Sequence, residues 1–332
     1  MTLDMPTEAP DTAQIDRLVA DLAQAKAAIG RRIFGQDRVI ELALTALLAG
    51  GHALLIGVPG VAKTRLVGTI GAVLGLDTKR VQFTPDLMPS DIIGAEVLEE
   101  SEDGKRAFRF IRGPVFTQLL MADEINRASP RTQSALLQAM QERQVTVAGT
   151  TYDLPRPFQV LATQNPIEQE GTYPLPEAQL DRFLLSVDVA YPDAAAERAM
   201  LIATTGVSDA GAEAVLTRDR LLEAQTLVRR LPVGDAIVDT ILKLTRGARP
   251  ETPASDSIRA HVAWGPGPRA GQAFMLAARA RALIDGRLAP SPADLAALAQ
   301  PILGHRMALT FAARAEGVTI ADVIDGLVKE IV

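Results

Sequence analysis

The sequence predicts an α/β fold, in which helices flank a parallel sheet of five strands and an all-helical domain follows at the C-terminus. Three observations support this prediction. Short apolar segments alternate with helical segments over residues 53–189, a pattern typical of a parallel sheet covered on both faces. A loop with two glycines follows the first apolar segment. After Tyr191-Pro192-Asp193 the strand patterns stop, and the remaining segments have helical periodicity.

Length and composition limit the number of domains and the classes of function. The 332 residues are 48% hydrophobic and 22% charged, enough for a sizeable core and two compact units. No apolar run approaches the roughly 20 residues of a membrane span, so we expect no integral membrane segment. Cysteine is absent, which excludes disulfides and thiolate metal sites and fits the cytoplasm, where we place the protein. A net charge of -6 and only 4% aromatic residues disfavour a nucleic-acid partner.

Residues 1–30 are predicted to form a helical lead-in. Apolar residues recur at helical spacing from Gln14 to Ala28. The preceding residues lack the positive charge and apolar block of a secretory signal. A second helix is predicted from Asp37 to Leu48, at the start of a core domain that spans residues 31–191.

The core domain should contain the five strands and two inserted hairpins. The predicted strands are 53–56, 80–83, 118–122, 158–162 and 184–189. Two segments, about 96–112 and 144–152, alternate apolar and polar residues around a turn, which indicates hairpins. The turns are expected at residues 102–105 and at Gly149.

Residues 192–332 are predicted to form the helical lid domain. Helices are expected at 194–204, 221–230, 235–246 and 270–285, with further helices up to residue 331. The Pro- and Gly-rich stretch 249–268 is expected to be a loop with one short helix.

The segment from Gly57 to Thr64 has the features of a phosphate-binding loop. Its backbone N–H groups can converge on phosphate oxygens, Lys63 can reach the terminal phosphates, and the Thr64 hydroxyl can bind Mg²⁺. Ala62 stands where such loops usually have glycine, and we expect it to adopt a right-handed helical conformation. The alternative is an ordinary Gly-Pro turn before a helix. The predicted nucleotide-binding residues are Gly57, Val58, Pro59, Gly60, Val61, Ala62, Lys63, Thr64 and Arg65.

Two carboxylates end the third predicted strand. Ligands of open α/β sheets bind at the carboxyl ends of strands, so Asp123 and Glu124 should face the nucleotide. We expect Asp123 to hold the Mg²⁺ shell, often through water, and Glu124 to polarise the attacking water. The alternative is a charged strand end that begins a loop.

Three further polar residues are candidates for catalysis. Asn165 follows the fourth strand and can hydrogen-bond a γ-phosphate, although Asn before Pro is equally typical of a turn. Arg182 can be an arginine finger or a surface residue paired with Asp181. Arg269 opens a lid helix and, near the cleft, would contact the nucleotide from the lid. Its alternative is an exposed arginine, although a cation at a helix start opposes the helix dipole.

Taken in chain order, these residues resemble the parts of AAA+ ATPases. Three longer segments resemble one branch of that class, the MoxR family. They are Phe83–Gly94 (FTPDLMPSDIIG), Asp123–Ala128 (DEINRA) and Asn165–Ala178 (NPIEQEGTYPLPEA). The resemblance covers nearly the whole chain after about Ile33.

The resemblance implies an ATP- and Mg²⁺-dependent ATPase that forms a homo-oligomeric ring, expected to be a hexamer, with ATP at subunit interfaces. It implies that Arg182 acts on the neighbouring subunit's ATP, that Asn165 and Arg269 are the first and second sensors, and that Gly35 and Gln36 lie near the adenine. It also implies that the two hairpins face the pore or a partner. The expected partners are a separate von Willebrand factor A domain protein and an unidentified protein client.

Three functions are compatible with these features. The leading hypothesis is a chaperone-like remodeller that assembles or activates a protein or enzyme complex, with hydrolysis changing the angle between sheet domain and lid. The second is a nucleic-acid motor of the AAA+ helicase type, and the third a nucleotide-gated binding module with little turnover. In support of the motor, the first hairpin contains a basic cluster, but neighbouring acidic residues offset its positive charge. These residues are Lys105, Arg106, Arg109 and Arg112, beside Glu96, Glu99, Glu100 and Glu102.

Overall fold

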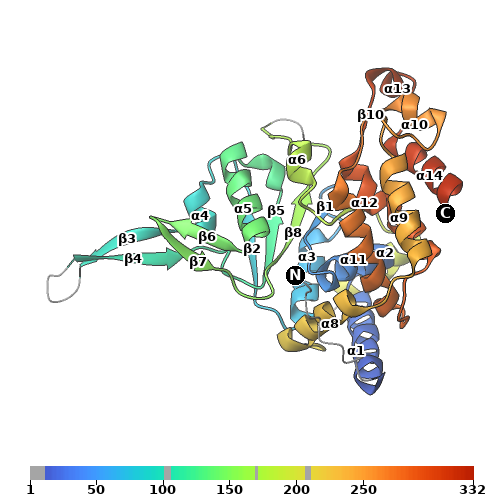
Figure 1. Cartoon of the computed structure of the whole chain (residues 1–332). Helices are drawn as coiled ribbons and strands as arrows, with labels where there is room; N and C mark the ends of the chain where they lie inside the picture. The colour runs from blue at the N-terminus through green and yellow to red at the C-terminus, as the bar shows by residue number, and fades with distance from the viewer. Residues whose placement is uncertain (1–11, 101–105, 169–170, 206–210) are drawn as a thin grey trace, which may run out of the picture.

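The computed structural model describes residues 12–100, 106–168, 171–205 and 211–332 (Figure 1). Two helices, α1 (Thr12–Gly30) and α2 (Asp37–Leu48), precede the sheet. The predicted helix over 14–28 is therefore present and slightly longer. Residues 1–11 of the expected lead-in (1–30) and the first hairpin turn at 102–105 lie outside the described residues.

Five parallel strands form the central sheet in the order β2-β5-β8-β1-β9. They are β1 (Ala53–Ile56), β2 (Thr78–Gln82), β5 (Leu119–Asp123), β8 (Gln159–Gln164) and β9 (Leu185–Asp188). Every residue of β5 is buried, as expected for a strand that other layers cover on both faces. The predicted fold class, a five-stranded parallel sheet flanked by helices and followed by a helical lid, is confirmed.

The sheet separates two hydrophobic cores. The core under α4 (Pro89–Ile93) and α5 (Pro130–Glu142) contains Phe83, Phe158 and Phe183. On the other face α1, α2 and α3 (Lys63–Val73) pack in a core that continues into the lid, where it includes Phe274 and Leu298. The lid and the nearer half of the sheet domain thus share one core.

Both predicted hairpins are present as antiparallel pairs. The first consists of β3 (Gly94–Glu100) and β4 (Arg106–Arg112), the second of β6 (Gln144–Val147) and β7 (Thr150–Asp153). Ala148 and Gly149 both have positive φ, as a tight hairpin turn requires. Figure 1 shows both hairpins projecting from the end of the molecule that lies opposite the lid.

The lid is mainly helical. Its helices are α7 (Ala194–Thr204), α8 (Arg218–Arg230), α9 (Asp235–Gly247), α10 (Asp256–His261), α11 (Pro268–Ile284), α12 (Pro292–Leu303), α13 (Phe311–Ala315) and α14 (Ile320–Ile331). One short pairing joins β10 (Val262–Trp264) to β11 (Ala308–Leu309). The stretch 249–268 therefore holds a strand beside its predicted short helix, because residues far away in sequence supply the pairing strand.

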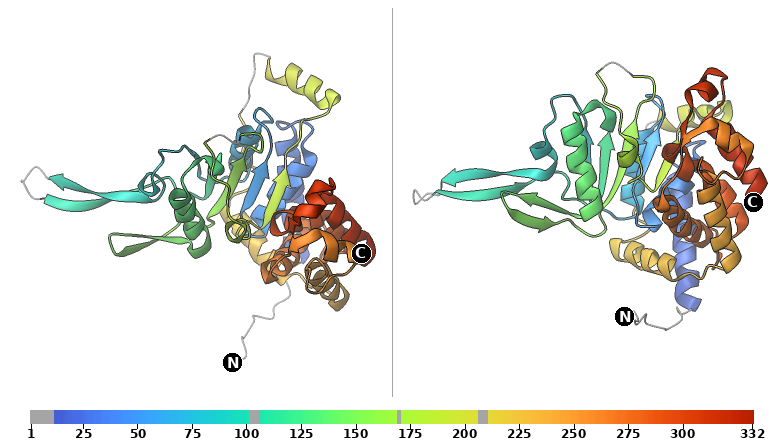
Figure 2. Two further views of the ribbon diagram at one scale, coloured as in Figure 1. Left: turned by 90° about the horizontal axis from the view of Figure 1, so that it is seen from above. Right: turned by 45° about the horizontal axis from the view of Figure 1, so that its top comes forward.

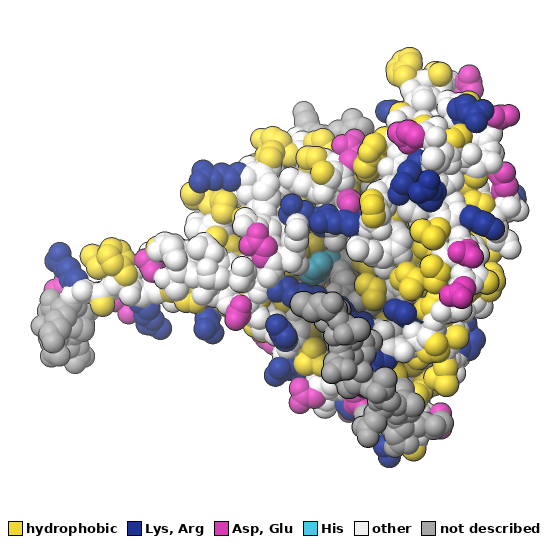
Figure 3. All heavy atoms as spheres, viewed as in Figure 1, with side chains coloured by type: hydrophobic (Ala, Val, Ile, Leu, Met, Phe, Trp, Pro, Cys, Tyr) yellow, Lys and Arg dark blue, Asp and Glu magenta, His cyan; other side chains and the backbone are white. Residues whose placement is uncertain are grey.

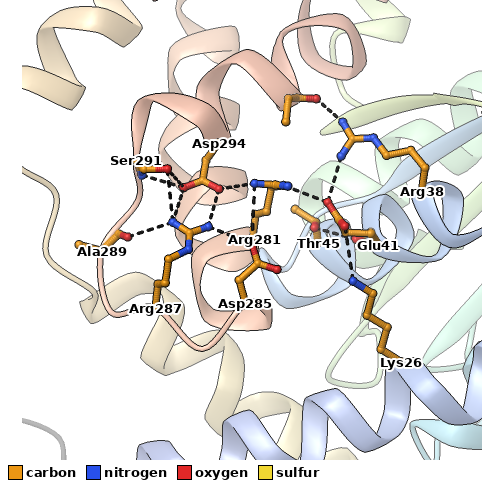
Figure 4. Close-up of polar contacts among 11 residues, drawn as sticks. Lys26, Arg38, Glu41, Thr45, Arg281, Asp285, Arg287, Ala289, Ser291 and Asp294 are labelled. Atoms are coloured by element: carbon orange, nitrogen blue, oxygen red, sulfur yellow. Dashed lines mark hydrogen bonds and ion pairs between the residues drawn. The ribbon is translucent and has the colours of Figure 1, made fainter.

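An ionic network joins the lid to the sheet domain (Figure 4). Arg281 of α11 donates to Glu41 of α2 (2.9 Å) and pairs with the fully buried Asp294 of α12. Burial alone would raise the pKa of Asp294, but hydrogen bonds from Arg287, Ser291 and Arg281 outweigh it and lower that pKa to about 2. With the shared core, this network opposes the hypothesis that the lid changes its angle within one chain.

Candidate active site

The phosphate-binding loop lies at the carboxyl edge of the sheet, where the strands end. Gly57 follows β1, and its N–H donates to the carbonyl of Gln164 at the end of β8 (3.1 Å). A Cβ on Gly57 would meet the carbonyl oxygen of Val189 at 2.5 Å, so only glycine fits between these strands. The Lys63 ammonium donates to the carbonyls of Gly57 and Val58. Thr64 and Arg65 follow in the first turn of α3.

Ala62 differs from its predicted conformation. We expected right-handed helical geometry, but Ala62 has φ 60° and ψ 23°, in the left-handed region, and caps α3. The prediction was wrong because the loop must reverse direction just before the helix, and that reversal requires positive φ whichever residue stands there. A Cβ in this region costs roughly 1–2 kcal/mol, which explains why glycine is usual at this position.

The acid pair, Asp123 and Glu124, lies at the carboxyl end of β5. The Asp123 carboxylate accepts from Arg80 (3.0 and 2.7 Å) and from the Thr163 hydroxyl. Glu124 has φ 56° and accepts from Gln82 (2.7 Å). Thr163 also accepts from the Glu124 N–H (2.8 Å), so one hydroxyl orients both acids.

The electrostatics link the acid pair to the loop. Burial lowers the pKa of Lys63, while the charges of Asp123 and Glu124 oppose that decrease. The lysine therefore lies within the field of both carboxylates. The Thr64 hydroxyl and these carboxylates are hard oxygen donors, which suit Mg²⁺. Because Arg80 and Thr163 already occupy both Asp123 oxygens, these residues fit an ion that Asp123 holds through water.

Asn165 follows β8, which lies between the acid-bearing β5 and the loop-bearing β1. Its side-chain carbonyl accepts from the Ile167 N–H (3.1 Å), so the turn proposed for Asn-Pro is present. This hydrogen bond orients the amide, because its oxygen is engaged and its Nδ2 remains a donor. Asn165 can therefore form the turn and still donate a hydrogen bond to a γ-phosphate.

Gly35 and Gln36 lie next to the chain that leaves β9. The Gln36 amide donates to the Ala190 carbonyl (2.8 Å), and a Cβ on Gly35 would collide with Ala196 at 2.5 Å. Val189, which contacts Gly57, is the neighbour of Ala190. The structure therefore brings Gly35 and Gln36 to the same edge as the phosphate-binding loop.

Arg182 and Arg269 lie at the opposite, amino edge of the sheet. The Leu184 N–H donates to the His52 carbonyl (2.8 Å), which places residues 181–184 beside the chain entering β1. Arg182, Arg269 and Arg143 line one hollow there, between the sheet domain and the lid (Figure 3). Arg269 was expected to contact the nucleotide from the lid if it lay near the cleft, with an exposed arginine as the alternative. Within one chain that condition is not met, because the packing of α11 directs its start to the amino edge.

The pairing of Asp181 decides between the alternatives for Arg182. Asp181 pairs with Arg306 (2.7 Å) and more distantly with Arg269 (3.7 Å). Within the described part of the chain Arg182 makes no ion pair. Arg182 is thus not the salt-bridged neighbour of Asp181 and remains available to a ligand.

Several residues escaped sequence reasoning. Arg306 is 2% exposed and donates to Asp181 and to the carbonyls of Phe183 and Leu184, so it holds the segment that carries Arg182. These three partners are more than 120 residues away in the sequence, and no local pattern marks Arg306. Arg143, left-handed at the end of α5, joins the hollow from a third element. Thr163, two residues before Asn165, could have been found as a hydroxyl near a strand end.

A phosphate-binding loop, an acidic strand end and a polar amide on a five-stranded parallel sheet with a helical lid define an ATPase of the AAA+ class. Comparison with known protein families gives the same class. Residues 52–185 match the ATPase family associated with various cellular activities (AAA), and residues 256–327 match the AAA lid domain. Among the described residues, no helix combines the length and apolar character that crossing a membrane requires.

Relatives narrow the class to one family. Chaperone MoxR1 of Mycobacterium tuberculosis is 42% identical, over 94% of this chain and 82% of that protein. Protein MoxR of Paracoccus denitrificans is 32% identical, over 88% and 89%. A candidate ATPase of Cytophaga hutchinsonii has a similar crystal structure, with TM-score 0.89, 35% identity and coverage of 96% and 97%. The chain belongs to the MoxR family of AAA+ ATPases.

Proposed function

We propose that this protein hydrolyses ATP with Mg²⁺ as a homo-oligomeric ring, expected to be a hexamer, and remodels protein substrates in the cytoplasm. Membership of a family that includes a chaperone supports the chaperone-like part of this proposal. The observation that carries it is the division of the site. The loop and the acid pair lie at one edge of the sheet, whereas Arg182 and Arg269 lie at the other.

Within one subunit, residues 57–65 bind the phosphates and Gly35 with Gln36 adjoins the adenine. Thr64 and Asp123 would hold Mg²⁺, which neutralises phosphate charge when bound. Glu124 polarises the attacking water, and Asn165 donates to the γ-phosphate or the water. The neighbouring subunit supplies Arg182 and Arg269 as cations for the charge that develops on the γ-phosphate.

Two different surfaces must meet to complete each site. Such a head-to-tail contact generates a ring when its rotation closes. Since the lid shares a core and an ionic network with its own sheet domain, we place the movement driven by hydrolysis between subunits rather than within one chain.

The charges and exposed apolar residues of the first hairpin, β3–β4, favour a protein client over a nucleic acid. Arg106 pairs with Glu100 (2.9 Å) and Arg109 with Glu99 (3.1 Å), so part of its positive charge is neutralised. Leu98 lies opposite Phe108 across the hairpin, and the two are 53% and 71% exposed. An exposed apolar pair of this kind suits contact with protein. We assign the hairpins to the client, or to a separate partner with a von Willebrand factor A domain.

Mixing two inactive variants tests the proposal. Glu124→Gln keeps Arg182 and nucleotide binding, while Arg182→Ala keeps Glu124. Alone, each should lose ATP turnover. In an equal mixture, about a quarter of the head-to-tail interfaces combine an intact Glu124 with an intact neighbouring Arg182, so turnover should recover to about that fraction.

Other outcomes would overturn parts of this assignment. If the mixture stays inactive while both variants assemble, Arg182 does not act on a neighbour's ATP. Normal turnover by Glu124→Gln would remove Glu124 as the base. Slow, concentration-independent turnover by the unmodified protein would favour a nucleotide-gated binding module.

A further inference from the structure

The helix α7 lies at the surface, and the described part of the chain leaves most of its apolar residues uncovered. None of its residues is buried, and Leu201 and Ile202 are 56% and 65% exposed. Ala195, Ala199 and Ile202 repeat at the i, i+4, i+7 spacing of one helix face, and all three are exposed. A surface helix normally buries such a face, because apolar area in water is unfavourable. The helix is nevertheless well formed, since Asp193 caps its first turn (2.8 Å).

A groove in the lid has matching chemistry. It lies between α9 and α11, and apolar side chains dominate its lining, including Ile241, Leu242 and Met275. Leu242 is 51% exposed although it lies in this groove. Arg246 and Arg249 also line the groove, whereas α7 carries one acidic and one basic residue, Glu197 and Arg198, so the match between the two surfaces is apolar.

Each of these surfaces adjoins one half of the divided ATP site. The groove shares Gln272 and Leu276 with the hollow that Arg182 and Arg269 line. At the other end, α7 begins beside Gly35, which contacts Pro192 and Ala196. A contact that brings the arginines to a neighbour's nucleotide would therefore bring the groove towards that neighbour's α7.

The two surfaces cannot meet within one chain as it is folded. Seen from above, α7 and the later helices of the lid, α9 to α14, lie far apart, with the strands of the sheet between them (Figure 2, left). The face that shows the arginine hollow also shows hydrophobic side chains gathered over the lid (Figure 3). An α7 helix that fills the groove must then come from another copy.

We propose that α7 of one subunit docks into the α9–α11 groove of the neighbouring subunit, the same neighbour that supplies Arg182 and Arg269. This contact rests on the proposed ring and specifies how it is held together. Docking buries the apolar face of α7 against the apolar lining of the groove. Because α7 follows directly from the chain beside Gly35 and Gln36, the contact also ties assembly to the nucleotide edge.

Cysteine cross-linking tests the contact directly, since the chain has no cysteine of its own. The Ile202→Cys, Leu242→Cys double variant, combined with Glu124→Gln and held with ATP, should form a ladder of covalent multimers on oxidation. A matched variant that pairs Ile202→Cys with Phe311→Cys, at an 86% exposed lid position, should not. A fast-moving monomer with an internal disulfide, or no ladder in assembled protein, would overturn the proposal.

Activity measurements separate this proposal from the divided ATP site. Ile202→Asp and Leu242→Asp should each raise the protein concentration for half-maximal turnover at least tenfold, whereas Phe311→Asp should leave it unchanged. Mixing Ile202→Asp with Leu242→Asp should restore part of the activity, because one chain keeps the helix and the other the groove. If Glu124→Gln and Arg182→Ala complement each other but neither aspartate variant changes assembly, the ring stands and this contact is wrong.

Discussion

The two edges of the sheet differ in how their functional residues are assembled. At the carboxyl edge, the phosphate-binding loop is one continuous segment, and the acids and Asn165 follow neighbouring strands. At the amino edge, Arg143, Arg182, Arg269 and Arg306 come from four places along 164 positions of the chain and meet only through lid packing. The comparison teaches that local geometry assembles the nucleotide-binding edge, whereas tertiary contacts gather the arginines of the other edge, which we propose acts on a neighbouring subunit. Four predictions can break or sharpen it.

The largest effect should separate turnover from binding. Arg182→Ala should lower ATP turnover about a thousandfold or more, the range of an arginine finger, and leave the nucleotide affinity of the isolated subunit unchanged. Lys63→Ala, at the carboxyl edge, should lose that affinity. Turnover assays and equilibrium nucleotide titration measure the two effects. Equal loss of affinity in Arg182→Ala would remove the distinction between the edges.

The amino edge should depend on the buried Arg306. Arg306→Met leaves Asp181 without its close partner and removes the hydrogen bonds to four carbonyls, so it should cost about 4 kcal/mol of unfolding free energy. Urea unfolding provides the measurement. Arg259→Met, which removes an exposed pair with Asp256, should cost below about 1 kcal/mol. Similar losses in both variants would contradict the special role of Arg306.

The amino edge should also be sensitive to acid. Burial lowers the pKa of His52 to about 4, and burial with the charge of Arg306 lowers that of His305 to about 3. Below pH 6.5 these two imidazoles bind protons in the unfolded chain but stay neutral in the folded chain. Their contribution to the free energy of unfolding is therefore complete above pH 6.5 and decreases towards pH 4. His52 alone accounts for about 3 kcal/mol.

Urea unfolding at pH 7 and pH 4.5 measures this loss. His52→Gln should reduce the pH dependence, whereas His261→Gln should not, because His261 is only partly buried and contacts Ser257. An unchanged slope in His52→Gln would show that other groups account for the acid sensitivity.

The smallest effect concerns the loop itself. Ala62→Gly should raise the unfolding free energy by about 0.5–1 kcal/mol, because glycine adopts the left-handed conformation without the cost of a Cβ. Ala72→Gly, at an exposed position in the same helix, should lower it by about 1 kcal/mol. If both variants are destabilised, the conformation of Ala62 does not carry a cost.

Sequence reasoning succeeded where neighbouring residues determine the outcome. The order of strands and helices follows from apolar periodicity, and both hairpins were predicted from alternation and turn residues. It failed where the outcome depends on a distant partner. The positive φ of Ala62 follows from the loop's path, the strand at 262–264 needs 308–309, and the position of Arg269 follows from how α11 packs. The boundary at Pro192 and the roles of the individual site residues stay predictions.

The sequence by itself determined that this protein binds a nucleoside triphosphate, because the groups that contact phosphate lie within one loop and the strand and helix beside it. Only the tertiary structure decided that the loop and the arginines lie at opposite edges of the sheet. Which cation pairs with Asp181, and which arginine remains available, depends on the packing of the lid against β9. Side chains separated by more than a hundred residues meet only after the core that positions them has formed.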